Sequence, residues 1–129
     1  MKFNTFTVLL KRGIPIAAVS LCTFALVTGC DSKTPADVFA SDPIALKRGK
    51  SIFTGTCSGY CHSTKAGLRD APYLFDCVWI HGGGDREIFA TVSNGVPDTR
   101  MVSFGGKLPQ GDDDIWRVIA YINSVRQSC

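Results

Sequence analysis

Three residues in the stretch CSGYCH have the types and spacing for a defined chemistry: Cys57, Cys61 and His62. Two thiols followed directly by an imidazole are the pattern that attaches haem covalently, because each thiol can form a thioether with a vinyl group and the histidine can ligate the iron. The usual spacing is C-x-x-C-H, and this chain has one residue more. Since both sulfurs must still reach two vinyl groups a fixed distance apart, we expect the additional residue to bulge from the loop, with Gly59 supplying backbone freedom.

The same two cysteines have other possible uses. They could form a local disulfide or a redox dithiol, remain buried thiols, or bind zinc together with His62. A structural zinc ion takes four ligands, usually from paired Cys or His motifs, and the remaining His81, Cys77 and Cys129 make no second close pair. Covalent haem is therefore the preferred interpretation, while a disulfide, free thiols and a zinc site stay open.

The second face of a haem iron either takes a protein ligand or stays open, and Met101 is the candidate ligand. Met1 lies in the leader described below, so Met101 is the single methionine of the expected domain. It lies in the Pro- and Gly-rich segment 96–111, and long irregular loops of this kind are usually functional or disordered. A thioether is a soft ligand, and Met/His ligation raises the reduction potential. His81 is the rival ligand, and Met101 could instead be a core methionine, with the iron site left open.

Residues 1–29 predict a targeting segment. A basic start is followed by an uncharged apolar run over 14–28, shorter than the roughly 20 residues of a membrane span and suited to a secretory signal. The run ends in VTGC, which resembles a bacterial lipoprotein signal in which Cys30 is lipidated and becomes the first residue. An uncleaved membrane anchor is the alternative. In either case we expect the folded part at the extracytoplasmic, periplasmic face of a bacterial membrane.

The charge balance argues against nucleic acid as a partner. The chain has 129 residues and a formal net charge of +3, and its length suits one small domain. Lys2, Lys11 and Arg12 in the leader account for that charge, so basic and acidic residues balance in the remainder. Binding to nucleic acid requires a basic patch. The remainder is also small for a core of its own, and a buried haem would supply apolar volume.

The positions of the six cysteines suggest a role for each. Cys22 lies in the leader, Cys30 is the lipid site, and Cys57 and Cys61 belong to the attachment motif. The remaining pair, Cys77 and Cys129, would lie in an oxidising compartment where disulfides persist. We predict that these two cysteines bond to each other, which the chain-entropy model values at about 4 kcal/mol for a loop of this size. Two free thiols are the alternative.

The sequence also predicts the elements that position the cysteine motif, beginning with a tether and a first helix. Residues 30–41 are mostly polar or small and predict a flexible tether, and the domain is expected over 42–129. The dipeptide Asp42-Pro43 is typical of a helix start, and the helix is expected to run to about Thr54. Gly49 lies on its apolar face although glycine costs about 1 kcal/mol relative to alanine in a helix interior. Its presence there suggests that another helix crosses very close, and a harmless, tolerated glycine is the alternative.

Two further helices are expected. One runs from Arg86 to about Ser93, with Asp85 as its cap and Asn94-Gly95 as its end. The last begins at the three aspartates 112–114, whose charge suits the positive end of a helix dipole. Apolar residues recur at helical spacing in both: Ile88, Phe89 and Val92, then Ile115, Val118, Ile119, Ile122 and Val125. Segments 63–70 and 96–111 lack periodicity and predict loops, and no strand pattern with hairpin signals is found.

Together these motifs resemble a small single-haem class I cytochrome c. Gly49 and Phe53 are similar to the family's G-x-x-x-F/Y, and the resemblance implies that the C-terminal helix crosses at this glycine. It also implies that Trp116 and Tyr121 are the aromatic partners there. The implied fold is all-α, with three to five helices wrapped around one covalently attached haem c.

The resemblance also implies roles for site residues. Pro72, with Leu74, resembles the segment G-P-x-L, whose proline carbonyl accepts the N–H of the proximal histidine. Met101 resembles the distal ligand within a G-x-P-x-T-x-M run. Trp79 and Arg100 are candidates to contact haem propionates, and an apolar pocket wall is expected from Phe75, Val78, Trp79 and Ile80. Three departures are the longer attachment motif, Val102 in place of proline and Ala71 in place of glycine, and none of them removes a ligand.

The resemblance implies a function. With both axial positions filled by protein, the chain would be a membrane-tethered single-electron carrier rather than an enzyme, working between a dehydrogenase or respiratory complex and an acceptor. The segment 79–106 resembles cytochromes that take electrons from quinoprotein alcohol dehydrogenases, so such a dehydrogenase or a terminal oxidase is the expected redox partner. The alternatives are a haem enzyme or a gas or peroxide sensor with a displaceable distal ligand, or a fixed haem subunit of a larger oxidoreductase.

Overall fold

The computed structural model describes residues 32–128, and these contain helices and loops but no strand. These residues lie within the second of the two units of the chain, residues 31–129. Its elements in chain order are α1 (Pro35–Ala40), α2 (Pro43–Ile52), the π-helical turn η1 (Phe53–Cys57), α3 (Asp85–Asn94) and α4 (Asp112–Val125). The prediction of an all-α fold is confirmed. None of the helices in the described part is long and apolar enough to cross a membrane.

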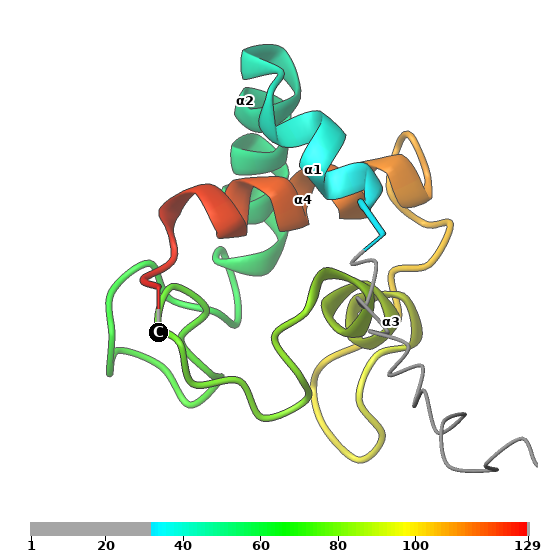
Figure 1. The fold of residues 1–129 in the computed structure, drawn as a ribbon. Helices are drawn as coiled ribbons and strands as arrows, with labels where there is room; N and C mark the ends of the chain where they lie inside the picture. Colours follow the sequence, from blue (N-terminus) through cyan, green and yellow to red (C-terminus); the bar gives the residue numbers. More distant parts are fainter. Residues whose placement is uncertain (1–31, 129) are drawn as a thin grey trace, which may run out of the picture. The chain divides into compact units, whose positions relative to one another are not determined.

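Helices α2 and α4 cross at the centre of the domain (Figure 1). The side chain of Asp42 caps α2 by accepting a hydrogen bond of 2.8 Å from the Ile44 N–H, as the sequence predicted. At the crossing, a Cβ added to Gly49 would lie 2.0 Å from the Arg117 carbonyl oxygen. The expectation that another helix crosses very close to Gly49 is therefore correct.

Helix α1 corrects the predicted tether. Residues 35–40 form a helix whose start is a capping box between Thr34 and Asp37. Ala36 is buried in the core cluster of Ile115 and Ile119, so this segment packs on α4. The tether prediction was wrong for these residues because six residues show too little periodicity to reveal a buried face. The folded domain therefore begins before residue 42.

Helix α3 begins one residue earlier than predicted. The Gly84 N–H donates to the Glu87 side chain over 2.9 Å, so Asp85 stands in the first turn rather than at the cap. Asp85 instead accepts hydrogen bonds from the Thr34 hydroxyl and the Asn123 amide, over 2.6 and 2.7 Å. It thereby ties α3 to the start of α1 and to α4. The helix ends at Gly95, which has φ +73°, as the Asn-Gly pair predicted.

Two aromatic pairs join the helices. Trp116 stacks on Phe89 of α3, with ring centroids 4.2 Å apart. Tyr121 packs on Phe53, with centroids 5.6 Å apart. Of the two aromatic residues expected at the crossing with α2, Tyr121 therefore contacts the α2 end, whereas Trp116 is stacked on α3.

The start of α4 holds a buried carboxylate that the sequence analysis did not single out. Asp114 is fully buried and accepts hydrogen bonds from the Arg48 Nε (2.6 Å) and the Arg117 guanidinium (2.9 Å). It also accepts a hydrogen bond of 3.0 Å from the Gln110 N–H. The hydrogen bond from Arg48 is the main cause that lowers the pKa of Asp114 to about 2, against the opposing effect of burial.

At the C-terminal end of α4, Val125 is 44% exposed. The buried stripe of this helix therefore stops at Ile122 rather than at Val125, where the sequence predicted its end.

Candidate haem site

The attachment motif begins where α2 widens into the π-helical turn η1. The Ser58 N–H donates to the Phe53 carbonyl over 2.7 Å, and the His62 N–H donates to the Cys57 carbonyl over 3.0 Å. Both bonds join residues five apart, and a π-type turn takes one residue more than an α-helical turn. The second of these turns spans the motif, so the additional residue is accommodated within it. The predicted bulge out of the loop was wrong.

Gly59 has a different role from the one expected. Its φ is not in the left-handed region, so the turn makes no use of glycine's backbone freedom. A Cβ at this position would instead lie 2.8 Å from the Gly55 carbonyl oxygen. Gly59 is thus required by the close approach of the backbone one turn earlier.

His62 is oriented by the segment that carries Pro72. The His62 Nδ1 lies 2.8 Å from the Pro72 carbonyl oxygen. A carbonyl oxygen can only accept a hydrogen bond, so Nδ1 carries the proton and Nε2 keeps its lone pair. A metal-ligating histidine usually has its other nitrogen bonded in this way, which fixes the tautomer and the ring orientation. The contact implied by the family resemblance is present.

The thiols of the motif are not paired with each other. No disulfide joins Cys57 to Cys61. Burial, and then the proximity of Cys61, raise the pKa of the Cys57 thiol to about 11. Within residues 32–128, no three or more His, Cys, Asp or Glu side chains are grouped closely enough to hold a metal ion. His81, the rival iron ligand, is exposed in a turn before α3.

Met101 is half-buried in a compact turn that follows α3. Its carbonyl accepts a hydrogen bond of 2.9 Å from the Val96 N–H, and its N–H donates to the Thr99 hydroxyl over 3.1 Å. A Cβ at Gly95 would lie 2.6 Å from the Met101 carbonyl oxygen, so the turn closes tightly on this glycine. Beyond it, the Phe104 N–H donates to the Val92 carbonyl over 3.0 Å. The loop of Met101 is thereby held to the end of α3.

The two candidate propionate contacts already have protein partners. The Trp79 indole N–H donates to the Asp76 carbonyl over 3.3 Å, and the Arg126 guanidinium lies 5.6 Å from the centroid of its ring. Arg100 donates to the carboxylate of Asp70. This hydrogen bond lowers the pKa of Asp70. The propionate role of Trp79 and Arg100 remains a prediction.

The apolar residues expected to line the pocket differ in their burial. Phe75 is buried as expected, but Val78 and Ile80, which were assigned to the pocket wall, are 71% and 72% exposed. Other large apolar side chains exposed in the segments around the motif and Met101 are Tyr60, Leu68 and Val102. The donor set of two thiols, an oriented imidazole and a thioether fits a covalently attached haem.

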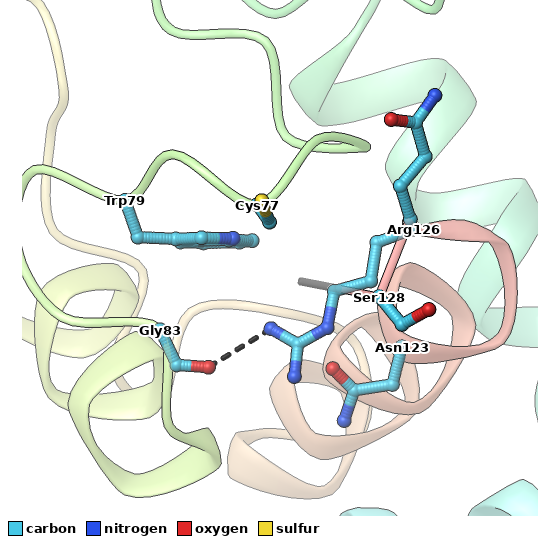
Figure 2. A pocket seen from close by; sticks show the side chains of 7 residues that line it. Cys77, Trp79, Gly83, Asn123, Arg126 and Ser128 are labelled. Atoms are coloured by element: carbon cyan, nitrogen blue, oxygen red, sulfur yellow. Dashed lines mark hydrogen bonds between the residues drawn. The ribbon is translucent and has the colours of Figure 1, made fainter.

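Cys77 and Ser128 line the same cavity (Figure 2). A cavity of about 500 Å³ is lined by residues of the 77–83 loop and of the end of α4, and Ser128 is among them. The Arg126 guanidinium donates to the Gly83 carbonyl over 2.9 Å, and the Gln127 N–H donates to the Phe75 carbonyl over 3.0 Å. Cys129, the predicted partner of Cys77, lies outside the described residues, as do Cys30 and the predicted leader.

Sequence reasoning missed two charged residues of the site. Arg69 donates to the Tyr60 carbonyl of the attachment motif over 2.6 Å, and Asp70 pairs with Arg100 beside Met101. The only sequence signal was two adjacent charges of opposite sign just before the Pro72 segment, and their partners lie in other loops.

Sequence reasoning also did not identify Ser93 as a buried polar residue. Its hydroxyl has no hydrogen-bond partner within the described part of the chain.

Comparison with known proteins relates the chain to one family. The sequence model of the family described as cytochrome c oxidase, cbb3-type, subunit III matches residues 44–122, more than half of the chain. The cbb3-type cytochrome c oxidase subunit CcoP of Rubrivivax gelatinosus is 37% identical over 62 residues, which are 47% of this chain and 20% of that protein. CcoP of Azospirillum brasilense is 32% identical over 94 residues, 64% of this chain and 32% of that protein.

A solved structure is also similar. Cytochrome cL from the marine methylotrophic bacterium Methylophaga aminisulfidivorans has a TM-score of 0.60 and 28% sequence identity, over 69% of this chain and 58% of that chain. The subunit FixP of Sinorhizobium medicae (strain WSM419) is 33% identical over 93 residues, 65% of this chain and 31% of that protein. The chain thus spans between a fifth and a third of the length of these curated relatives.

Proposed function

The chain belongs to the family of cbb3-type cytochrome c oxidase subunit III, and from this premise we propose that it is a monohaem class I c-type cytochrome that carries single electrons. The contact between the His62 Nδ1 and the Pro72 carbonyl, 2.8 Å long, is the observation that carries the proposal. It orients the ring so that the Nε2 lone pair is available to ligate iron. The same motif would hold one haem c through Cys57 and Cys61. When bound, the haem supplies a reversible one-electron change at iron.

The residues of the chain serve this carrier role by holding the site fixed. Pro72 keeps the His62 ring in one tautomer and orientation. The turn closed on Gly95 presents Met101 as the second ligand, since its backbone is bonded on both sides of the residue. With a thioether and an imidazole as ligands, the site would have a raised reduction potential and no open position for a substrate. This arrangement favours an electron carrier over a haem enzyme or a gas or peroxide sensor.

The partner we propose is a terminal oxidase or another redox protein. The curated relatives are named as subunits of cbb3-type oxidases, which supports an oxidase as the acceptor. It also supports a second candidate function, that of a fixed haem subunit of a larger oxidoreductase. Co-purification of a large complex after mild detergent extraction would support the fixed subunit, whereas a freely exchanging monomer would support the carrier. A quinoprotein dehydrogenase remains the proposed donor on the sequence resemblance alone.

We further propose that the chain is a periplasmic lipoprotein. The VTGC end of the leader supports cleavage before Cys30 and lipidation of that cysteine. A lipid tether would keep the carrier near membrane complexes and raise its effective concentration there. Ser128 lines the same cavity as Cys77, which supports a disulfide between Cys77 and Cys129 that would bind residue 129 to the loop before Trp79.

An optical spectrum of the periplasmically matured protein tests the cofactor and both ligands. Haem that stays with the chain in alkaline pyridine would establish covalent attachment, and the far-red sulfur-to-iron band of the native ferric protein would establish Met101 as a ligand. A C57A/C61A variant is the control for attachment, and M101H is the control for the band. Haem without the band would move the assignment to His81 or to an open site, and no covalent haem would refute the carrier function. Rapid and complete CO uptake by the ferrous protein would favour a sensor or an enzyme.

A further inference from the structure

Asp70 and Arg100 connect the two loops that carry the candidate axial ligands. The Arg100 Nη2 atom donates to both carboxylate oxygens of Asp70. Asp70 stands two residues before Pro72, whose carbonyl orients His62, and Arg100 directly precedes Met101. The pair therefore bridges the segment that supports the first ligand and the turn that supplies the second.

The neighbouring residue anchors this bridge to the attachment motif. The Arg69 guanidinium donates to the Tyr60 carbonyl over 2.6 Å and to the Gly59 carbonyl over 3.5 Å. Two adjacent side chains thus contact different parts of the site, one the cysteine loop and the other the Met101 turn. A movement of Arg100 away from Asp70 would separate the Met101 turn from a segment that is otherwise held to the motif.

The Met101 turn has few other polar contacts with the rest of the domain. Within residues 32–128, the hydrogen bonds of segment 96–101 are local, between Val96, Thr99 and Met101, except for those of Arg100 with Asp70. A turn held mainly by its own bonds can swing as a unit about its ends. The Asp70 contact is the one that opposes such a swing near the ligand itself.

We propose that the Asp70–Arg100 pair is a clasp that keeps Met101 on the haem iron, with Asp70 as a positioning residue. This rests on the proposed ligation by Met101 and adds a determinant of how easily that ligand leaves. The side chains of Arg100 and Asp70 are 66% and 76% exposed, so the clasp is modest in strength and weakened by salt. The ease of opening of the distal ligand should therefore depend on ionic strength.

Imidazole binding to the ferric haem-loaded protein tests the clasp, because imidazole competes with Met101 for the iron. We expect D70N and R100Q each to raise the imidazole affinity about two- to five-fold at low salt, the range of an exposed ion pair. The double variant should show no more than either single one, and the difference from wild type should disappear at high salt. D70E should restore the wild-type affinity. D98N is the matched control, since Asp98 lies in the same turn and makes no ion pair within the described residues.

The outcomes separate the clasp from the ligation on which it rests. A wild-type protein without the far-red sulfur-to-iron band would overturn Met101 ligation and the clasp together. A wild-type protein with the band, but with the same imidazole affinity in D70N, would overturn the clasp alone. An effect of R100Q without an effect of D70N would assign Arg100 to another partner, such as a haem propionate, and would also overturn it. Equal effects of D70N and D98N would show a general charge effect and would refute the pair.

Discussion

Gly49 of α2 faces the backbone of Arg117 in α4 so closely that a Cβ at Gly49 would lie 2.0 Å from the Arg117 carbonyl oxygen. The two helices touch backbone to backbone here, and Phe53, the first residue of η1 and four residues after Gly49, is fully buried. Because α2 continues into η1 and the first cysteine of the motif, the angle at this crossing also sets where the attachment loop begins.

The variant G49A should therefore be strongly destabilised. A methyl group cannot be accommodated against a backbone carbonyl without separation of the helices, and overpacking of this kind typically costs about 1–3 kcal/mol. Chemical denaturation of the haem-loaded protein measures the change. G55A is the control, since nothing lies within 4 Å of a Cβ at Gly55, and it should be as stable as wild type or more so. Equal stabilities of the two variants would contradict the close crossing.

The variant G59A should lower the yield of covalently attached haem. Its Cβ would lie 2.8 Å from the Gly55 carbonyl oxygen, which forces open the wide turns that place Cys57, Cys61 and His62. The ratio of haem stain to total protein on a denaturing gel is the measurement. S58A changes a neighbouring side chain of the same loop and should mature normally. A full yield from G59A would show that the turn can relax without cost.

The variant D114N should be destabilised by about 2 kcal/mol, since it removes the charge of a fully buried carboxylate that accepts hydrogen bonds from Arg48 and Arg117, and hydrogen bonds to charged groups contribute about 1.5–3 kcal/mol. D113N is the matched control: it removes the same charge from the same turn, but its side chain is 64% exposed, and a change within about 0.5 kcal/mol is expected. Urea unfolding at neutral pH measures both. Comparable losses in the two variants would refute a special role for the buried carboxylate.

Acid stability should also depend on Asp114. Its pKa is lowered from 3.8 to about 2 in the folded protein, so the folded state binds this proton less readily than the unfolded chain. Its contribution to stability is therefore present above pH 3.8 and is lost as the pH falls towards 2. Unfolding free energies measured across this window should fall more steeply for wild type than for D114N. Parallel curves would show that other carboxylates dominate acid unfolding.

Cys77 and Cys129 should be resistant to alkylation in the denatured, non-reduced protein. The chain-entropy model values a disulfide of this loop size at about 4 kcal/mol, so C77S and C129S should each lower the free energy of unfolding by up to that amount. The double variant should lose no more than either single one, because one bond is removed in all three. Mass spectrometry of alkylated peptides gives the pairing directly. Losses that add in the double variant would contradict a shared bond.

Local signals predicted the helix boundaries well. The starts of α2 and α4 follow from Asp42 and from the aspartates at 112–114, and the end of α3 follows from Gly95, because caps and left-handed glycines act within a few residues. The crossing at Gly49 was one of two alternatives that the apolar face left open, the other being a glycine that is merely tolerated, and the family resemblance favoured the crossing. These features depend on neighbours in the sequence or on the absence of a side chain.

The features that sequence reasoning missed depend on partners far along the chain. Helix α1 is short and gains its stability from Ala36 against α4. The choice between a bulge and a π-type turn at the motif depends on which carbonyl the His62 N–H reaches, and composition does not determine this. The partner of Asp70 lies in another loop, and the burial of Asp114 depends on Arg48 from α2. The ligand residues themselves were predictable from their chemistry, whereas the groups that hold them were not.

Both buried clusters of the domain are built on α4, which supplies Ile115, Ile119 and Ala120 to one and Val118 and Ile122 to the other. This helix follows every other described helix along the chain. A nascent chain that has emerged only as far as residue 111 therefore lacks the central element of either core. Neither buried cluster can close before α4 has been made, so folding of the domain has to wait for that helix.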